Sequence, residues 1–238
     1  MNKYLLRFSK QGNMRFISHL DLGRLFRRAI KKAEIDIAFS NGYNPHEKMN
    51  IVQPLSLGFE SNSEYLEITT LSPNDPAMIV RLLNTSMPSG IEFYDCKEID
   101  QSINNMSVKT DAAIYSIYVK GSIEEYEKLD TEAFLSQDDI VIKKRDKKTK
   151  TMVDKSVKDM VFGIIKDHCD ETGYFLGVSV RCASNESLNP VNLLASLYEF
   201  NGMSFVSENV RVKRLDLLTK ISNYEYISLF EFDQDEDF

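Results

Sequence analysis

The sequence predicts an α+β protein of two ferredoxin-like domains in tandem, each with the element order β-α-β-β-α-β. Three observations support this prediction. The 238 residues, with a hydrophobic content of 42%, suit two domains of about 100 to 130 residues each. Segments with strand-like and helix-like hydrophobic periodicity follow one another in the required order. A polar, aperiodic segment at residues 99–111 separates two sets of elements, which predicts domains at residues 1–100 and 109–238.

The first domain contains all six elements of the plan. Alternating or continuous apolar runs predict the strands, and a recurrence every three or four residues predicts the helices. In chain order we expect a strand at 4–10, a helix at 18–33, extended pieces at 35–40 and 48–55 around a turn, a strand at 64–70, a helix at 75–87 and a strand at 91–99.

The second domain follows the same plan with additions. In chain order we expect a strand at 113–121, a helix at 122–136, a basic hairpin at 138–155, strands at 160–167 and 173–182, a helix at 189–200 and a strand at 210–218. The segment at residues 231–238 carries five acids in eight residues, and we expect a solvated, frayed acidic tail.

Charge is unevenly distributed along the chain. The formal net charge is −7, yet residues 1–55 hold ten Lys and Arg against four Asp and Glu. Nucleic acids respond to such local fields more than to net charge. No apolar run is long enough for a membrane span, and no signal peptide is recognisable, so we expect a cytoplasmic protein without a membrane partner. Three dispersed cysteines predict free thiols, and we expect no cofactor and no metal site.

The predicted first helix concentrates cations. Ser18 and Asp21 fit a capping box at its start. Its apolar residues recur at the spacing of a buried face. The opposite face carries a strip of positive charge, to which we assign nucleic-acid binding together with the preceding Arg15. The strip consists of Arg24, Arg27, Arg28, Lys31 and Lys32.

Two interpretations of the strip remain open. The lysines of the last turn are favoured by the helix dipole and could form an ordinary solvated face. The arginines lie in the middle of the helix without acidic partners at i+4, so their mutual repulsion favours a bound anion. Arginine also suits phosphate, because its planar guanidinium donates two parallel hydrogen bonds.

A pocket is predicted beside His19, formed with Asp21 and Gly23. Glycine within a helix costs about 1 kcal/mol relative to alanine, and it leaves room close to the backbone. The alternative is that His19 is an ordinary packing residue.

The turn NGYNPHE projects three side chains that could stack on a base, transfer a proton and bind a phosphate: Tyr43, His46 and Lys48. An ordinary polar loop is the alternative. The six residues at 35–40 span about 20 Å as a strand, close to the length of the helix. We therefore expect the turn to return to His19 and Arg15 and to form one pocket with them.

The second basic segment, residues 143–150, carries six cations and one acid at the tip of the predicted hairpin. Lysine-rich tips often serve only to prevent strand pairing. Alternatively, they follow a nucleic-acid backbone without reading bases. The candidate phosphate contacts are Lys143, Lys144, Arg145, Lys147 and Lys148.

Residues 4–68 closely resemble the N-terminal signature of the radical SAM-linked proteins, the domain-of-unknown-function family 2344. The pattern comprises an Arg-Phe strand, a Ser-His-Leu-Asp helix start with Arg and an Arg-Ala pair downstream, a Gly-Tyr-Asn-Pro turn and a Leu-x-x-Gly-x-x-Ser-x-x-Glu segment. The matching positions are Arg7, Phe8, Ser18, His19, Leu20, Asp21, Arg24, Arg28, Ala29, Ser40, Gly42, Tyr43, Asn44, Pro45, His46, Lys48, Leu55, Gly58, Ser61 and Glu64. Further on, Lys155-Ser156 replaces an Arg-Pro that is frequent in the family.

The resemblance implies a partner and an RNA context. Members of that family are encoded beside, or fused to, radical SAM enzymes, in neighbourhoods associated with RNA processing. This chain has no Cys-x-x-x-Cys-x-x-Cys motif for an iron–sulfur cluster, so radical chemistry would belong to the partner enzyme. The first hypothesis is therefore an RNA-binding accessory protein, without catalysis of its own, that presents tRNA or rRNA to a radical SAM enzyme.

Two other functions compete with this one. Tandem ferredoxin-like domains resemble the CRISPR repeat-processing endoribonucleases, and a metal-independent cleavage would use His19 and His46 as acid and base, with Lys48 or Arg28 stabilising the phosphorane. The glycine-rich loop of those enzymes is missing, because residues 201–218 contain only Gly202. The third hypothesis is a protein–protein adaptor whose cationic strip meets an acidic face of the enzyme.

Overall fold

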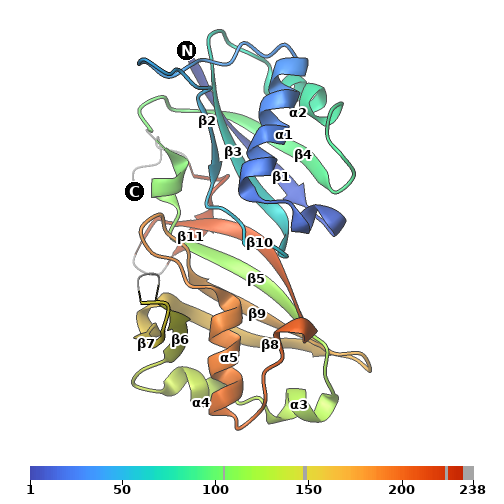
Figure 1. Cartoon of the computed structure of the whole chain (residues 1–238), viewed down its shortest axis with the longest axis vertical. Coiled ribbons are helices and arrows are strands. Elements are labelled where there is room, and N and C mark those ends of the chain that lie inside the picture. Colours follow the sequence, from blue (N-terminus) through green and yellow to red (C-terminus); the bar gives the residue numbers. More distant parts are fainter. Residues whose placement is uncertain (104, 147–148, 223–224, 233–238) are drawn as a thin grey trace. The chain divides into compact units, whose positions relative to one another are not determined.

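The structure is a computed structural model that describes residues 1–103, 105–146, 149–222 and 225–232. The chain forms two compact units (Figure 1). Unit 1 comprises Met1–Asp111 together with the segment from Arg214 onward, and unit 2 comprises Ala112–Lys213. Each unit combines antiparallel strands with a small number of helices, so the predicted α+β class is confirmed.

Unit 1 contains the elements of the first predicted domain in the predicted order, followed at the end of the chain by two further strands. The elements are β1 (Asn2–Lys10), η1 (Gly12–Phe16), α1 (His19–Lys32), β2 (Met49–Val52), β3 (Glu60–Thr70), α2 (Pro76–Asn84), β4 (Ile91–Ile99), η2 (Met106–Lys109), the part of β10 (Val210–Lys220) that starts at Arg214, and β11 (Tyr226–Ser228).

The strands of unit 1 follow the order β4-β1-β3-β10, with β2 also paired to β3 and β11 to β10. β1 pairs antiparallel with both β3 and β4, as does β2 with β3. Both helices pack on the same face of this sheet, where apolar residues of α1, α2, β1, β3 and β4 form one core. At its centre Phe8, Phe26 and Phe93 hold their ring centroids 5.0 to 5.3 Å apart, an arrangement that favours edge-on and tilted contacts.

In its described residues, unit 2 contains three antiparallel strands in the order β5-β9-β8, a separate two-stranded hairpin and three α-helices. Its elements are β5 (Ala112–Val119), α3 (Ile123–Lys128), α4 (Thr131–Ser136), β6 (Val141–Arg145), β7 (Met152–Ser156), η3 (Lys158–Met160), β8 (Val161–Cys169), β9 (Tyr174–Arg181), α5 (Pro190–Phe200), η4 (Ser207–Asn209) and the first residues of β10. The helix predicted at 122–136 is two helices, because the Asp130 side chain accepts a hydrogen bond from the Ala133 amide and starts a new one.

The finer prediction of two ferredoxin-like domains in tandem is not confirmed. The predicted second domain, residues 109–238, does not coincide with one compact unit, because residues from Arg214 onward group with unit 1. The physical reason is that β10 is the neighbour of β3 in the sheet, and Arg214 pairs there with Glu64. Partners 150 residues apart leave no periodic signal in the sequence.

The predicted acidic tail is described only at its beginning, and residues 233–238 lie outside the described residues. The described part is held on unit 1 rather than frayed. The Phe230 ring stacks on Tyr65 at 6.5 Å between centroids, and the carbonyl oxygen of Phe232 accepts a hydrogen bond from Lys97 Nζ at 2.8 Å.

Candidate nucleic-acid interface

Helix α1 carries the side chains of the candidate interface. Its predicted start, with Ser18 as the N-cap residue, is confirmed. The Ser18 side chain accepts a hydrogen bond from the Asp21 amide at 3.1 Å, and its hydroxyl donates to the Asp21 carboxylate at 2.7 Å. These bonds lower the pKa of Asp21, the Ser18 bond most, followed by that from Arg24. Leu22, Phe26 and Ile30 are buried against the sheet, so the opposite face of α1 is fixed toward solvent.

The cations on this face differ in their partners. Arg24 pairs with Asp21 at 2.9 Å, one turn earlier in the helix, and Arg27 pairs with Glu47 at 3.6 Å. Among the residues that the structure describes, three exposed cations of α1 have no hydrogen bond or ion pair, namely Arg28, Lys31 and Lys32. We call these three side chains the open cations. The Asp21 carboxylate interacts electrostatically with Arg28, but no carboxylate of the described residues forms an ion pair with any of the three. A bound anion would therefore offset their mutual repulsion.

The NGYNPHE turn lies at the C-terminal end of α1, where the ion pair of Arg27 and Glu47 holds its base. Ile37 forms a bridge with Thr70, and Ser40 donates its amide proton to the His46 carbonyl oxygen at 2.8 Å. Tyr43 at the tip is fully exposed. A fully exposed tyrosine beside a cationic helix end is suited to stacking on a base.

The predicted single pocket of His19 and the turn does not form. His46 lies in a cavity with Lys3, whereas His19 interacts electrostatically with Lys10 and Glu64. Lys3 and Lys10 are the two ends of β1, separated by about 23 Å of strand. Residues 35–40 do not return along α1, because Ile37 pairs with the end of β3 instead. Arg15 stays at the His19 end, paired with Glu60 at 3.4 Å and stacked on Phe16.

A buried charged cluster lies near His19. Its residue Glu64 belongs to the family signature, but no sequence motif pointed to its partner Arg214. Arg214 donates two hydrogen bonds to the Glu64 carboxylate, at 2.7 and 2.5 Å, and the exposed fraction of each side chain is 2%. Arg214 also donates to the Gln53 carbonyl oxygen at 2.7 Å, which the left-handed backbone of Gln53, with φ of 47°, turns toward it. These hydrogen bonds connect β10 with β3 and with Gln53, the residue that follows β2.

The buried cluster changes the ionisation of its neighbours. Burial lowers the pKa of Lys10, and Arg214 adds to that effect while Glu64 opposes it. The imidazole of His19 is exposed at its surface, but partial desolvation lowers its pKa, with Lys10 acting in the same direction and Glu64 against it. A neutral His19 is thereby favoured.

Gly23 does not lie beneath a tight contact. A methyl group added there would meet only the guanidinium of Arg27, at 3.5 Å. Asp21 next to it is occupied with Ser18 and Arg24. The pocket of His19, Asp21 and Gly23 stays a prediction.

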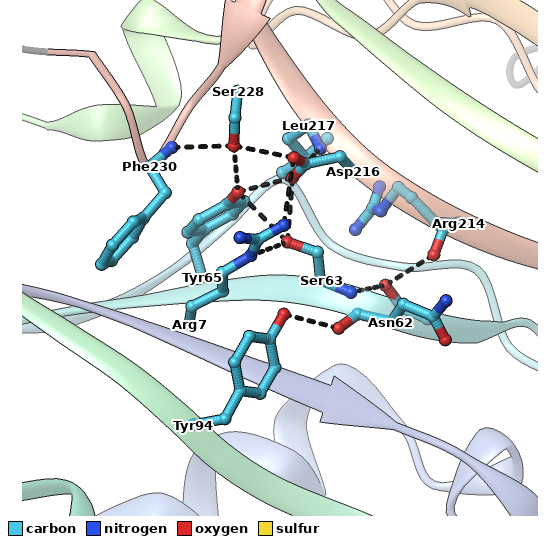
Figure 2. Close-up of polar contacts among 11 residues, drawn as sticks. Arg7, Asn62, Ser63, Tyr65, Tyr94, Arg214, Asp216, Leu217, Ser228 and Phe230 are labelled. Atoms are coloured by element: carbon cyan, nitrogen blue, oxygen red, sulfur yellow. Dashed lines mark hydrogen bonds and ion pairs between the residues drawn. The ribbon is translucent and has the colours of Figure 1, made fainter.

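A second polar cluster connects the C-terminal segment with β1 and β3 within unit 1. Figure 2 shows the carboxylate of Asp216 at its centre. It accepts hydrogen bonds from Ser63 at 2.8 Å, Tyr65 at 2.5 Å and Ser228 at 2.7 Å, and pairs with Arg7 at 3.2 Å. Burial, followed by the charge of Asp216, raises the pKa of the Tyr65 hydroxyl. Because the groups satisfy one another, we interpret this cluster as structural.

The basic hairpin in unit 2 is confirmed as β6 and β7, which pair antiparallel. Lys143 pairs with Glu199 at 2.7 Å, a contact that raises the pKa of the lysine, and Arg145 donates to the Lys150 carbonyl oxygen at 3.0 Å. Lys144 is exposed. Lys147 and Lys148, also predicted phosphate contacts, lie outside the described residues. The hairpin is thus partly neutralised, and its role in binding stays a prediction.

The described residues hold neither a metal cluster nor a membrane-spanning helix. No group of three or more His, Cys, Asp or Glu side chains that could hold a metal ion is found within the part of the chain that the structure describes. The three cysteines form no disulfide with one another, in agreement with the prediction, and burial raises the pKa of Cys96 to about 12. No described helix is long and apolar enough to cross a membrane.

The family comparison confirms the DUF2344 part of the resemblance, whereas the link to radical SAM enzymes stays a prediction. The model of the family described as an uncharacterized protein conserved in bacteria (DUF2344) matches residues 3–190. No curated protein matches the sequence.

Solved structures show only distant similarity. A crystal structure of a Cbf5–Nop10–Gar1 complex aligns over 90% of this chain and 48% of that chain, with 10% identity and a TM-score of 0.49. The structure of an H/ACA RNP bound to a substrate RNA containing 2′-deoxyuridine aligns over 89% and 46%, with 9% identity and a TM-score of 0.45. An unknown protein from Galdieria sulphuraria aligns over 90% and 98%, with 11% identity and a TM-score of 0.26. The chain spans about half the length of the first two proteins.

Proposed function

We propose an RNA-binding role for this chain, which belongs to the DUF2344 family of proteins conserved in bacteria. One observation supports it above all others: the open cations Arg28, Lys31 and Lys32 are exposed on a rigid helix and have no carboxylate partner among the described residues. Arginine and lysine side chains in this situation gain most from phosphate, because no internal pair has to be broken first.

The neighbouring turn extends this surface. Tyr43 is fully exposed, and the ion pair between Arg27 and Glu47 joins the turn to the same end of α1. Cations that follow a backbone, together with an aromatic ring that accepts a base, are the usual parts of a surface for single-stranded or looped RNA.

The nature of the partner enzyme is the finer part of the proposal. The sequence resemblance favours an accessory protein that presents tRNA or rRNA to a radical SAM enzyme. The three cysteines, far apart in the sequence, offer no cluster site in this chain, so the proposal assigns the radical chemistry to the partner.

The two competing functions are less well supported. A cleavage mechanism that shares acid and base roles between His19 and His46 needs both imidazoles at one phosphate, but they lie toward opposite ends of β1. An adaptor that meets an acidic protein face would use the same open cations. The adaptor therefore differs from the proposed function in its ligand, not in its surface.

Two measurements test the proposal: whether the protein binds RNA, and whether the RNA stays intact. The protein is titrated into labelled structured RNA by fluorescence anisotropy, and the RNA is then examined on a denaturing gel after hours in chelator. We expect binding without cleavage. The double variant Arg28→Gln/Lys31→Gln should bind about tenfold more weakly, since each exposed cation that binds phosphate contributes about 0.7 kcal/mol.

A matched control separates the interface from general charge. Lys120→Gln/Lys128→Gln removes the same two positive charges from exposed positions in unit 2, and its affinity should stay within about twofold of the wild type. Equal losses of affinity in both double variants would show that binding depends on net charge and not on the open cations. Clean cleavage that is abolished in His19→Ala would support the nuclease instead.

A further inference from the structure

A cavity of unit 1 lies at the end of β1 opposite His19 and has a volume of about 560 Å³. It opens between the start of β1, the base of the turn, β2, β3 and the segment before η2. Cavities of this size accommodate small organic ligands. The volume alone does not identify a ligand, but the polar groups around it restrict the choice.

The floor of the cavity is a satisfied ion pair. Lys3 and Glu67 lie 3.1 Å apart with less than a tenth of each side chain exposed. Lys3 also donates to the Ile103 carbonyl oxygen, and Glu67 accepts from the Met106 amide at 2.8 Å. These contacts build the cavity and contribute no net charge to it.

The wall contains one cation without a charged partner among the described residues. Lys48 is half-buried, and its amine makes only a weak contact, 3.8 Å from the thioether of Met1. Glu47, its neighbour in the sequence, is paired with Arg27. A partly desolvated ammonium group with no carboxylate partner favours a ligand with one negative charge.

Three further groups point to hydrogen bonding with a planar ligand. His46 Nδ1 lies 3.1 Å from the Asn44 carbonyl oxygen. A carbonyl can only accept, so Nδ1 carries the proton, which leaves Nε2 of the neutral ring as an acceptor. Asn50 Nδ2 donates to Asn105 Oδ1 at 2.9 Å. No partner is found among the described residues for the two remaining amide atoms, Asn50 Oδ1 and Asn105 Nδ2.

The two asparagines therefore offer an acceptor and a donor from adjacent amide groups. This combination matches the edge of a nucleobase, on which a donor and an acceptor are neighbours. Met1, Met49 and Ile103 supply the apolar part of the lining, which suits the face of a base. Lys48 completes the set with a charge suited to phosphate.

We propose that this cavity binds a single nucleoside monophosphate unit, with Asn50 and Asn105 recognising the base edge and Lys48 the phosphate. That the unit belongs to an RNA rests on the function proposed above, whereas the site itself does not. A free mononucleotide has the same chemistry, so the experiment must distinguish the two sources.

The test uses the full chain and defined probes. Isothermal titration measures the affinity for AMP, GMP, CMP and UMP, for ribose 5-phosphate, for inorganic phosphate and for trinucleotides with each base at the centre. We expect saturable binding of at least one mononucleotide, at least tenfold tighter than ribose 5-phosphate. A trinucleotide that binds at least tenfold tighter again identifies RNA as the source, and equal affinities identify the free nucleotide.

Variants locate the site. Lys48→Gln should weaken mononucleotide binding about tenfold or more, and Asn50→Asp should change the preference among the four bases. Lys120→Gln, which removes one charge from an exposed position in unit 2 outside the cavity, should change mononucleotide affinity less than twofold. Thermal unfolding of each variant checks that the fold is intact.

Each failure has a distinct meaning. The proposed site is wrong if no mononucleotide saturates the protein, if inorganic phosphate binds as tightly as the nucleotides, or if folded Lys48→Gln binds like the wild type. Mononucleotide binding without RNA binding would contradict the proposed function but leave the cavity site intact. RNA binding that depends on Arg28 but not on Lys48 would support the proposed function and contradict the proposed RNA-binding role of the cavity.

Discussion

The two ends of unit 1 hold their charged side chains in opposite environments. At the Lys10 end of β1, Glu64 and Arg214 form a bidentate pair whose side chains are 2% exposed. At the other end, in the last turns of α1, three cations are exposed and have no ion pair among the described residues: Arg28, Lys31 and Lys32. The second end also holds the buried pair of Lys3 and Glu67, but the open cations themselves have no hydrogen bond or ion pair among the described residues.

This difference separates structural charge from binding charge. A buried pair that satisfies itself stabilises or specifies the fold and leaves nothing for a ligand. An exposed cation without a partner contributes little to folding and is free to meet an anion. Substitutions at the buried end should therefore change stability, whereas substitutions at the exposed end should change binding.

The largest effect is expected at the buried pair. Arg214→Met leaves the Glu64 carboxylate in the interior without its partner, which should lower the free energy of unfolding by about 3 to 5 kcal/mol in chemical denaturation. The double variant Glu64→Leu/Arg214→Met removes both charges and should recover a large part of that stability. A decrease below about 1 kcal/mol in Arg214→Met would show that the pair is not the structural anchor described here.

A smaller effect of opposite sign is expected at Gly23. Gly23→Ala adds a methyl group that meets only the Arg27 guanidinium at 3.5 Å, so the better helix propensity of alanine should raise the free energy of unfolding by up to about 1 kcal/mol. Thermal or urea unfolding measures the gain. RNA affinity should not change, because the open cations lie farther along α1. A stabilised variant with impaired binding would instead favour the predicted pocket beside His19.

The smallest effect concerns pH. The pKa of His19 is lowered in the folded protein, chiefly by desolvation, so the unfolded chain takes up the proton first as the pH falls. The stability associated with neutral His19 is present above the unfolded pKa of about 6.5 and is lost as the pH falls through the lower folded pKa.

His19→Gln should therefore reduce the drop in melting temperature between about pH 7 and pH 5. An NMR titration of the His19 imidazole checks the direction of the shift independently. A folded pKa above the unfolded value would reverse the predicted slope and contradict the assigned environment.

The sequence predicted local structure better than long-range pairing. The apolar spacing of Leu22, Phe26 and Ile30 was enough to orient α1, because a helix face is decided by residues within one segment. The turn at residues 41–47 was recognised from Asn, Gly and Pro, but its position was predicted wrongly. That position depends on the pairing of Ile37 with Thr70, which spacing along the chain does not reveal.

The candidate site shows the same limit. The exposed cations could be named from the sequence, since their exposure follows from the helix register. The sequence did not show which of these cations lack an ion pair. Arg27 is paired with Glu47 and Arg24 with Asp21, and neither pairing was predicted. No sequence pattern indicated the role of Arg214, because its partner Glu64 is far away in the chain.

The salt dependence of RNA binding tests the central claim most directly. The affinity of the wild type and of Arg28→Gln/Lys31→Gln is measured for one RNA over a series of salt concentrations, and the slope of log affinity against log salt is compared. If both side chains bind phosphate, the slope should decrease by about one for each cation removed, while the melting temperature stays unchanged. An unchanged slope and affinity in the folded double variant would contradict phosphate binding by α1 and leave the open cations as an ordinary solvated face.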